Sequence, residues 1–191
     1  MWGELLIDSL KRPRAAARRV LDVGIPTPQL VEAAVLVAVV GVVLGYLALL
    51  MSPEAVDVVS AAVIHNPLLG AAAQLAVMAV AVFLTVRIGR LFGGKGTTAG
   101  ALALVVWLNA VMVLIQAAQL VALAVLPPLA TVLAIATILW ALWAFANFIA
   151  ELHGFQNPFI VLAVVVLTAI VVFFATAMFF AILGITPQGT P

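Results

Sequence analysis

The chain has 191 residues, of which 67% are hydrophobic and 8% are charged, with a formal net charge of +1 and no cysteine. A soluble domain has about 25% charged residues, so this composition excludes a soluble globular protein and predicts an integral membrane protein. Without cysteine, disulfides, thiolate metal sites, iron–sulfur clusters and a cysteine nucleophile are also excluded.

Residues 1–28 are expected to form a cytoplasmic interfacial segment. Its apolar side chains recur at helical spacing: Trp2, Leu5, Leu6 and Leu10. Pro13 is well placed to begin a second short helix that carries Arg14, Arg18 and Arg19. An apolar face beside bases predicts a helix lying on the membrane, with the basic cluster facing anionic lipids. The same bases could instead serve only to set topology.

Five stretches are apolar over the roughly 20 residues that a spanning helix needs. They cover residues 29–51, 68–88, 101–126, 129–150 and 159–183. Only Pro127-Pro128 separates the third stretch from the fourth, which predicts a tight hairpin there. The predicted fold class is therefore all-α: a polytopic transmembrane bundle of five helices over residues 29–184, preceded by the interfacial amphipathic segment and followed by an outside tail at 185–191.

Orientation follows from the placement of the 8 Lys and Arg residues. All of them precede the first span or lie between the second and third, which places these segments in the cytoplasm. Arg-, Ala- and Val-rich usage is typical of a GC-rich bacterial genome. We therefore expect a multi-pass protein of the cytoplasmic (inner) membrane of a bacterium, with its N-terminus in the cytoplasm and its C-terminus in the periplasm or outside.

Two sets of residues in the spans are candidates for helix association or for a polar cavity. Small residues form one narrow stripe on the first span: Ala34, Ala38, Gly41, Gly45 and Ala48. Such a stripe lets two helix backbones approach closely, either within the monomer or at a homodimer or partner face. Amides recur on the second, third and fourth spans: Gln74, Asn109, Gln116, Gln119 and Asn147. They could hydrogen-bond across helices or line a cavity for a small solute or a lipid headgroup.

Ionisable residues near the spans map to their cytoplasmic ends. Glu32, Arg87 and Glu151 are expected to form a shallow charge layer, with Arg87 paired to Glu151 or Glu32. Because no charge lies at mid-membrane, ion-coupled transport is disfavoured.

Residues 89–98 read GRLFGGKGTT, one residue away from the phosphate-binding loop GxxxxGK[ST]. A phosphate loop joins a β-strand to a helix, whereas this stretch joins two spans, so we expect a cytoplasmic turn and no nucleotide. Thr97 or Thr98 is expected to cap the third span.

His65 and His153 fall on opposite sides of the membrane and cannot share a metal ion. We therefore expect no catalytic, cofactor-binding or metal-binding residue, and no nucleic-acid partner.

The stretches LIDSLKRPRAAARRVLD, GRLFGGKGT, ALALVVWLNAV and WALWAFANFIAELHGF resemble bacterial members of the Yip domain family, named for Ypt/Rab-interacting proteins. The resemblance implies five spans with a cytoplasmic N-terminus. Eukaryotic members act through prenylated Rab GTPases, but this chain has no acidic-Leu-Tyr-Gly-Pro motif, so GTPase binding is not carried over. Five positions match the family pattern without assigned roles: Pro13, Arg14, Gly93, Gly94 and Gly96.

The predicted function is that of a non-enzymatic integral membrane protein acting by helix–helix association. It would organise lipids or serve as an accessory component of a larger membrane complex, with other membrane subunits or further copies of itself as partners. The alternative is a permeation pathway for a small solute or a lipid, lined by the amides.

Overall fold

The computed structural model describes residues 2–51 and 66–182. The regular elements within these ranges are all helices: α1 (Trp2–Lys11), α2 (Pro13–Val23), α3 (Thr27–Met51), α5 (Pro67–Leu91), α6 (Thr98–Val125), α7 (Pro127–His153) and α8 (Pro158–Ile182). The last five are long and apolar enough to cross a membrane. The predicted all-α fold with five long helices and a short N-terminal pair is thus confirmed. His65 and the predicted tail at 185–191 lie outside the described residues.

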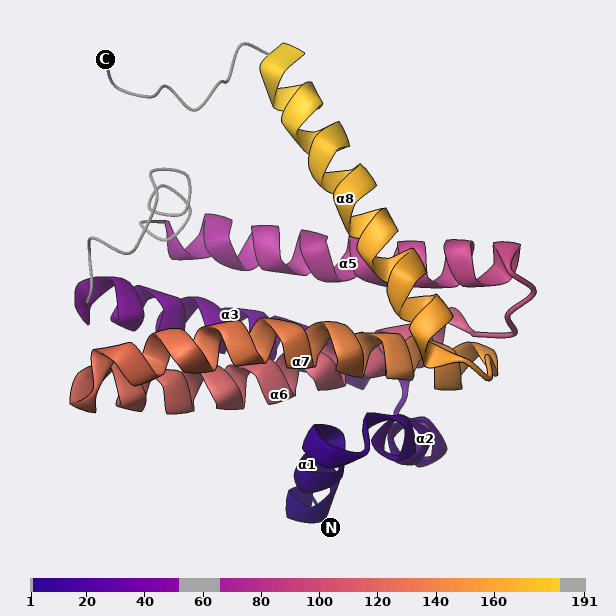
Figure 1. The fold of residues 1–191 in the computed structure, drawn as a ribbon, viewed down its shortest axis with the longest axis horizontal. Coiled ribbons are helices and arrows are strands. Elements are labelled where there is room, and N and C mark those ends of the chain that lie inside the picture. Colours follow the sequence, from indigo (N-terminus) through magenta and orange to yellow (C-terminus); the bar gives the residue numbers. More distant parts are fainter. Residues whose placement is uncertain (1, 52–65, 183–191) are drawn as a thin grey trace.

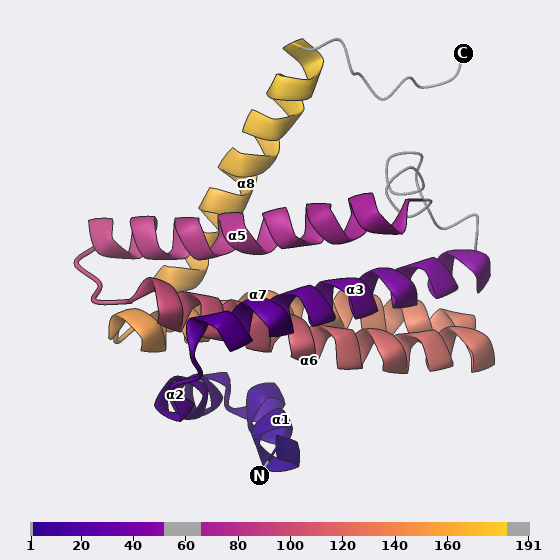
Figure 2. The ribbon, with the colours of Figure 1, turned by 180° about the vertical axis from the view of Figure 1, so that it is seen from behind.

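Helices α3, α5, α6 and α7 lie side by side as a four-helix layer (Figures 1 and 2). The predicted hairpin at the two prolines is present, because α6 ends at Val125 and α7 begins at Pro127. Proline is tolerated in a first helical turn, where its missing N–H group would have no partner anyway. α6 can therefore reverse into α7 within one intervening residue, Leu126.

Side-chain caps and glycines define the ends of several long helices. Asn66 Oδ1 accepts from the Leu69 N–H at 3.2 Å and begins α5, while Thr97 Oγ1 accepts from the Gly100 N–H at 3.1 Å and begins α6. These bonds satisfy N–H groups that the first helical turn leaves without a partner. α7 ends at His153 and is followed by Gly154, whose φ of 75° is favourable for glycine. Of the two threonines predicted as the cap, Thr97 forms it and Thr98 is the first residue of α6.

The short helices α1 and α2 cross the side of the long-helix layer (Figures 1 and 2). The buried face of α2 consists of Pro13, Ala16, Ala17 and Val20. It contacts α6 and α7, where it shares a core cluster with Leu104 and Phe148. Small alanine side chains allow this close approach. The apolar face of α2 is therefore covered by protein, whereas a helix lying free on the membrane would present it to lipid.

Helix α8 leaves the other long helices at a steep angle (Figure 1). Near its start it packs on α7, where Val161 joins Ala146, Ile149 and Ala150 in one cluster. Of the residues in its most apolar 18-residue stretch, only 6% are buried. An apolar cavity of about 640 Å³ opens between α5, α7 and α8.

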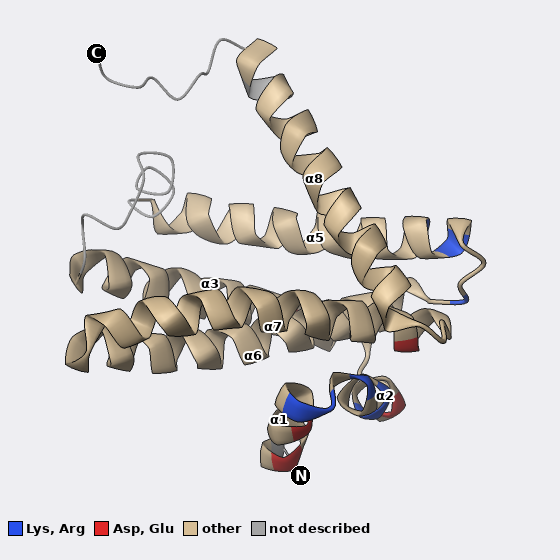
Figure 3. Cartoon of the chain, viewed as in Figure 1, with Lys and Arg blue, Asp and Glu red and all other residues tan. Residues whose placement is uncertain are grey.

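All 8 Lys and Arg residues lie in the described ranges. Those of α5 and of the turn after it lie at one end of the layer, and those of α1 and α2 lie beside the layer, set back from that end (Figure 3). We call this the charged end: the end where α5 and α7 finish and where α3, α6 and α8 begin. Glu151 lies at the same end, on the last turn of α7.

Candidate functional site: the charged end of the helix bundle

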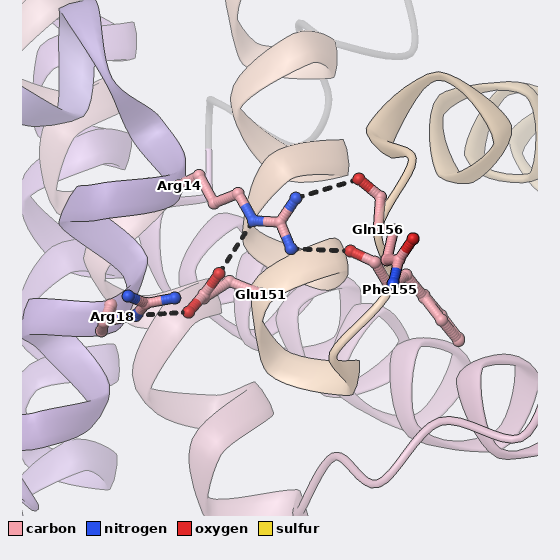
Figure 4. A network of polar contacts seen from close by, with 5 residues as sticks. All are labelled: Arg14, Arg18, Glu151, Phe155 and Gln156. Carbon is pink, nitrogen blue, oxygen red and sulfur yellow. Dashed lines mark hydrogen bonds and ion pairs between the residues drawn. The ribbon is translucent and has the colours of Figure 1, made fainter.

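The polar network at the charged end joins α2 to the end of α7 (Figure 4). Arg14 Nε donates to Glu151 Oε2 at 2.9 Å, and Arg18 Nε donates to Glu151 Oε1 at 2.7 Å. Arg14 also donates to the carbonyl oxygens of Gln156 and Phe155, at 3.1 and 2.7 Å. A planar guanidinium can serve three acceptors because its five N–H groups point in fixed directions. One arginine thus ties α2 to both α7 and the turn that leads into α8.

Burial differs sharply among the three charged groups of this network. The Glu151 side chain is 10% exposed, whereas the side chains of Arg14 and Arg18 are 37% and 69% exposed. The hydrogen bond to Glu151, followed by its charge, raises the pKa of Arg18 above its ordinary value. The half-buried Arg14 is therefore the main structural partner, and Arg18 contributes at the solvent edge.

Two indoles hold α1 against the long helices. Trp107 Nε1 on α6 donates to Ser9 Oγ at 2.9 Å, and Ser9 Oγ donates to the Leu5 carbonyl at 2.8 Å. Trp140 Nε1 on α7 donates to the Leu10 carbonyl at 3.3 Å. These bonds and the Arg14–Glu151 contact hold both short helices against α6 and α7 near the junction of α1 and α2.

His153 lies inside the glycine-rich turn between α5 and α6. Its Nδ1 accepts from the Gly96 N–H at 3.1 Å, and its Nε2 lies 3.1 Å from the Thr85 carbonyl oxygen. A donor at one nitrogen and a carbonyl at the other require the neutral ring with its proton on Nε2. His153 is 4% exposed, and its imidazole links the end of α7 to both α5 and the turn.

The glycines of the turn match this histidine in shape. A Cβ atom built on Gly89, Gly94 or Gly96 would overlap the His153 ring. Gly93 is constrained differently, because its φ of 79° strains other residues. The glycines of GRLFGGKGTT are therefore explained by the closeness of the His153 ring and, at Gly93, by the positive φ. A bound phosphate is not needed to explain them.

The small-residue stripe of α3 faces the inside of the layer. Ala34 and Ala38 are buried, and Ala48 is half-buried. A Cβ on Gly41 would lie 3.5 Å from Val113 of α6, and one on Gly45 would lie 3.7 Å from the Gln116 amide nitrogen. The stripe thus contacts α6 of the same chain. The sequence had left open whether it packs within the monomer or at a homodimer or partner face.

Three of the five predicted amides gather around one crevice. A space of about 490 Å³ between α3, α5 and α6 is lined by Gln74, Asn109 and Gln116. Their amides are engaged within the protein: Gln74 Nε2 donates to Asn109 Oδ1 at 2.9 Å, and Gln116 Nε2 donates to the Gly41 carbonyl at 3.3 Å.

The other two amides lie elsewhere. Gln119 Nε2 donates to Thr137 Oγ1 across the α6–α7 hairpin at 2.9 Å, and Asn147 Nδ2 donates to the Trp143 carbonyl of its own helix at 2.8 Å. Neither residue lines the crevice between α3, α5 and α6.

The expected charge layer has a different pairing. Arg87 forms no ion pair with Glu151 or Glu32 among the described residues, because Glu151 is taken by Arg14 and Arg18. Glu32 is exposed near the start of α3. The Arg87 guanidinium instead lies over the Phe83 ring, 5.3 Å from its centroid, in a cation–π contact. The predicted partner was wrong because α2 brings two arginines to Glu151 from a segment that was expected to lie on lipid.

Five helices that are long and apolar enough to cross a membrane define a polytopic integral membrane protein. The Yip1 domain model matches residues 7–179, and the chain therefore belongs to the Yip1 domain family. The resemblance seen in the sequence is thereby confirmed. No curated protein matches the chain, and no solved structure matches it.

Proposed function

We propose that this protein is a non-enzymatic component of a bacterial cytoplasmic membrane that organises anionic lipids at the charged end. The observation that carries the proposal is the way α1 and α2 are held against α6 and α7 by Arg14, Trp107 and Trp140. Lys11 and Arg12 lie exposed at their junction, and neither forms an ion pair with a described carboxylate. Each base near an anionic surface contributes about 1 kcal/mol of attraction.

The proposed orientation places the charged end in the cytoplasm. Support comes from the positions of the 8 Lys and Arg residues along the chain, which all precede α3 or lie near the end of α5 and in the turn after it, since cytoplasmic segments carry an excess of these residues. The C-terminus would then lie on the opposite side.

The test of lipid organisation uses purified full-length protein in vesicles of mixed phosphatidylcholine and phosphatidylglycerol. Spin-labelled lipids report which headgroup is motionally restricted at the protein boundary. We expect phosphatidylglycerol to be preferred, with a preference that weakens at high salt and in the Lys11→Gln/Arg12→Gln variant. Equal restriction of both lipids by the unaltered protein would refute the proposal.

The same proposal includes a role as an accessory component of a larger complex. Because the small-residue stripe contacts α6, we infer that the exposed apolar face of α8 receives another membrane subunit or a second copy. Purification in mild detergent followed by mass spectrometry tests this part. Recovery of lipid alone, with a monomeric protein, would remove the accessory role and leave the lipid role.

A permeation pathway is the second candidate function, and the polar crevice between α3, α5 and α6 is the observation that favours it. The natural chain has no cysteine, so a Gln74→Cys variant can be labelled without background. Reaction with a membrane-impermeant maleimide would show that water reaches the crevice. Absence of labelling, with normal folding, would make the crevice a dry packing feature and reject the pathway.

A further inference from the structure

A second basic surface lies on α5 and α6, apart from the basic junction of α1 and α2 (Figures 1 and 3). Here a groove of about 500 Å³ runs between the two long helices. Its apolar lining includes Ala79, Val82, Val86 and Leu102, and its other end is lined by Arg87, Arg90 and Thr98. The groove is therefore amphipathic along its length, with its cations at the charged end of the bundle.

The two arginines of this groove are free to bind an anion. Both side chains are exposed, and neither forms an ion pair with a carboxylate in the part of the chain that the structure describes. Phe83 lies beneath Arg87 and holds its guanidinium 5.3 Å from the ring centroid. Thr98 is the first residue of α6, so a hydroxyl and the positive end of a helix lie beside the cations.

The length of the groove corresponds to one leaflet of a bilayer. Ala79 and Arg90 are eleven residues apart on α5, which at 1.5 Å per residue is roughly 16 Å, or about half of a 30 Å hydrocarbon core. Its cationic end lies near the end of α5 and beside the start of α6, and its apolar end extends toward the middle of α5. An occupant with an anionic head and an apolar tail of one-leaflet length fits this arrangement.

We propose that the groove binds one anionic phospholipid. Its phosphate would lie between Arg87 and Arg90 beside Thr98, and an acyl chain would follow Val86, Val82 and Ala79. Guanidinium groups bind phosphate through charge-assisted hydrogen bonds. The apolar lining favours a lipid over free phosphate, because a free anion gains nothing from that surface. The inference rests on the proposed function only in placing the charged end at a bilayer surface.

The test is native mass spectrometry of purified full-length protein exchanged into detergent with a limited amount of phosphatidylglycerol or phosphatidylcholine. We expect one phosphatidylglycerol to remain bound after detergent removal. Each charge-assisted hydrogen bond contributes about 1.5–3 kcal/mol, so Arg87→Gln/Arg90→Gln should lower the retained fraction by about tenfold or more. Ala79→Trp, which fills the apolar end without changing charge, should also lower it. Excess inorganic phosphate should not displace the lipid.

The matched control is Lys11→Gln/Arg12→Gln, which removes the same charge at the other basic surface and should leave this lipid bound. Equal losses in the two double variants would mean non-specific attraction and would overturn the inference. So would unchanged retention in Arg87→Gln/Arg90→Gln, or displacement by phosphate together with no effect of Ala79→Trp. If the groove test fails but phosphatidylglycerol is still preferred at the protein boundary, lipid binding in the groove is rejected and the proposed function stands. The reverse pattern rejects the proposed function and keeps the groove.

Discussion

Glu151 on α7 accepts a hydrogen bond from Arg14 on α2 at 2.9 Å, across 137 residues of sequence. The contact places a carboxylate with 10% side-chain exposure opposite a guanidinium that also serves two backbone carbonyls. Arg18 reaches the other oxygen of the same carboxylate but is 69% exposed. The attachment of the N-terminal helices therefore depends unequally on two arginines that lie one turn apart.

The first prediction follows from this inequality. Arg14→Gln should loosen α2 more than Arg18→Gln, because it removes bonds to three acceptors at a half-buried position. We expect a loss of about 1–2 kcal/mol for Arg14→Gln and less than about 1 kcal/mol for Arg18→Gln. Hydrogen exchange of the α2 amides in detergent measures both values. Equal protection of α2 in the two variants would contradict the assigned roles.

The second prediction concerns His153 and the glycine turn. Gly94→Ala should destabilise the protein by about 1–3 kcal/mol, since the new methyl group must displace a packed ring. In a His153→Ala background the same change should cost much less, because the obstructing ring is gone. Thermal unfolding of the two single variants and the double variant gives the coupling directly.

Gly93→Ala is the control for this cycle. Its cost comes from a φ of 79° and should not depend on His153. If Gly94→Ala is equally harmful with and without His153, the turn is constrained by its backbone and not by the ring.

The long helices were predictable because crossing hydrocarbon requires about 20 consecutive apolar residues, a condition that is local in sequence. The hairpin at Pro127 and the cap at Thr97 were predictable for the same reason: each depends on a few adjacent residues. The small-residue stripe of α3 could also be predicted, but its partner helix could not. Such a stripe packs equally well against a helix of the same chain and against a helix of another protein.

The contacts at the charged end could not be predicted from local patterns. Glu151 had Arg87 as its apparent partner because both map to the same end of their spans. The partner becomes clear only from the packing of α2 on α6 and α7, which brings Arg14 into hydrogen-bond distance of Glu151. The sequence likewise indicated only that His153 ends a helix. The glycines, 57 or more residues earlier, indicated only a flexible turn. The clustered glycines were the available signal, but they do not indicate which side chain fills the space.

The third prediction tests the direction in which the α3 stripe faces. Gly41→Ala should be tolerated, because its Cβ would lie at an ordinary 3.5 Å from Val113. Gly41→Ile should overpack the α3–α6 contact and destabilise the monomer by about 1–3 kcal/mol. Thermal unfolding and light scattering on the same samples separate stability from association. A Gly41→Ile protein that stays fully stable but loses an oligomer would show that the stripe faces another chain.

The fourth prediction addresses the amides of the crevice. Gln74 and Asn109 bond to each other at 2.9 Å, and Asn109 also donates to the Val105 carbonyl of its own helix at 2.8 Å. Interhelical hydrogen bonds in membranes contribute on average about 0.6 kcal/mol, so Gln74→Leu alone should destabilise the protein only slightly. Gln74→Leu/Asn109→Leu should recover part of that loss, since it leaves no amide without its partner.

Unfolding of the two single variants and the double variant measures this coupling. If the amides are purely structural, the double variant should keep its fold and its lipid preference, and vesicles containing it should be no less permeable to small solutes than those with the natural protein. A clear fall in solute flux with a preserved fold would instead mean that these side chains line a path, and it would move the protein to the permeation class.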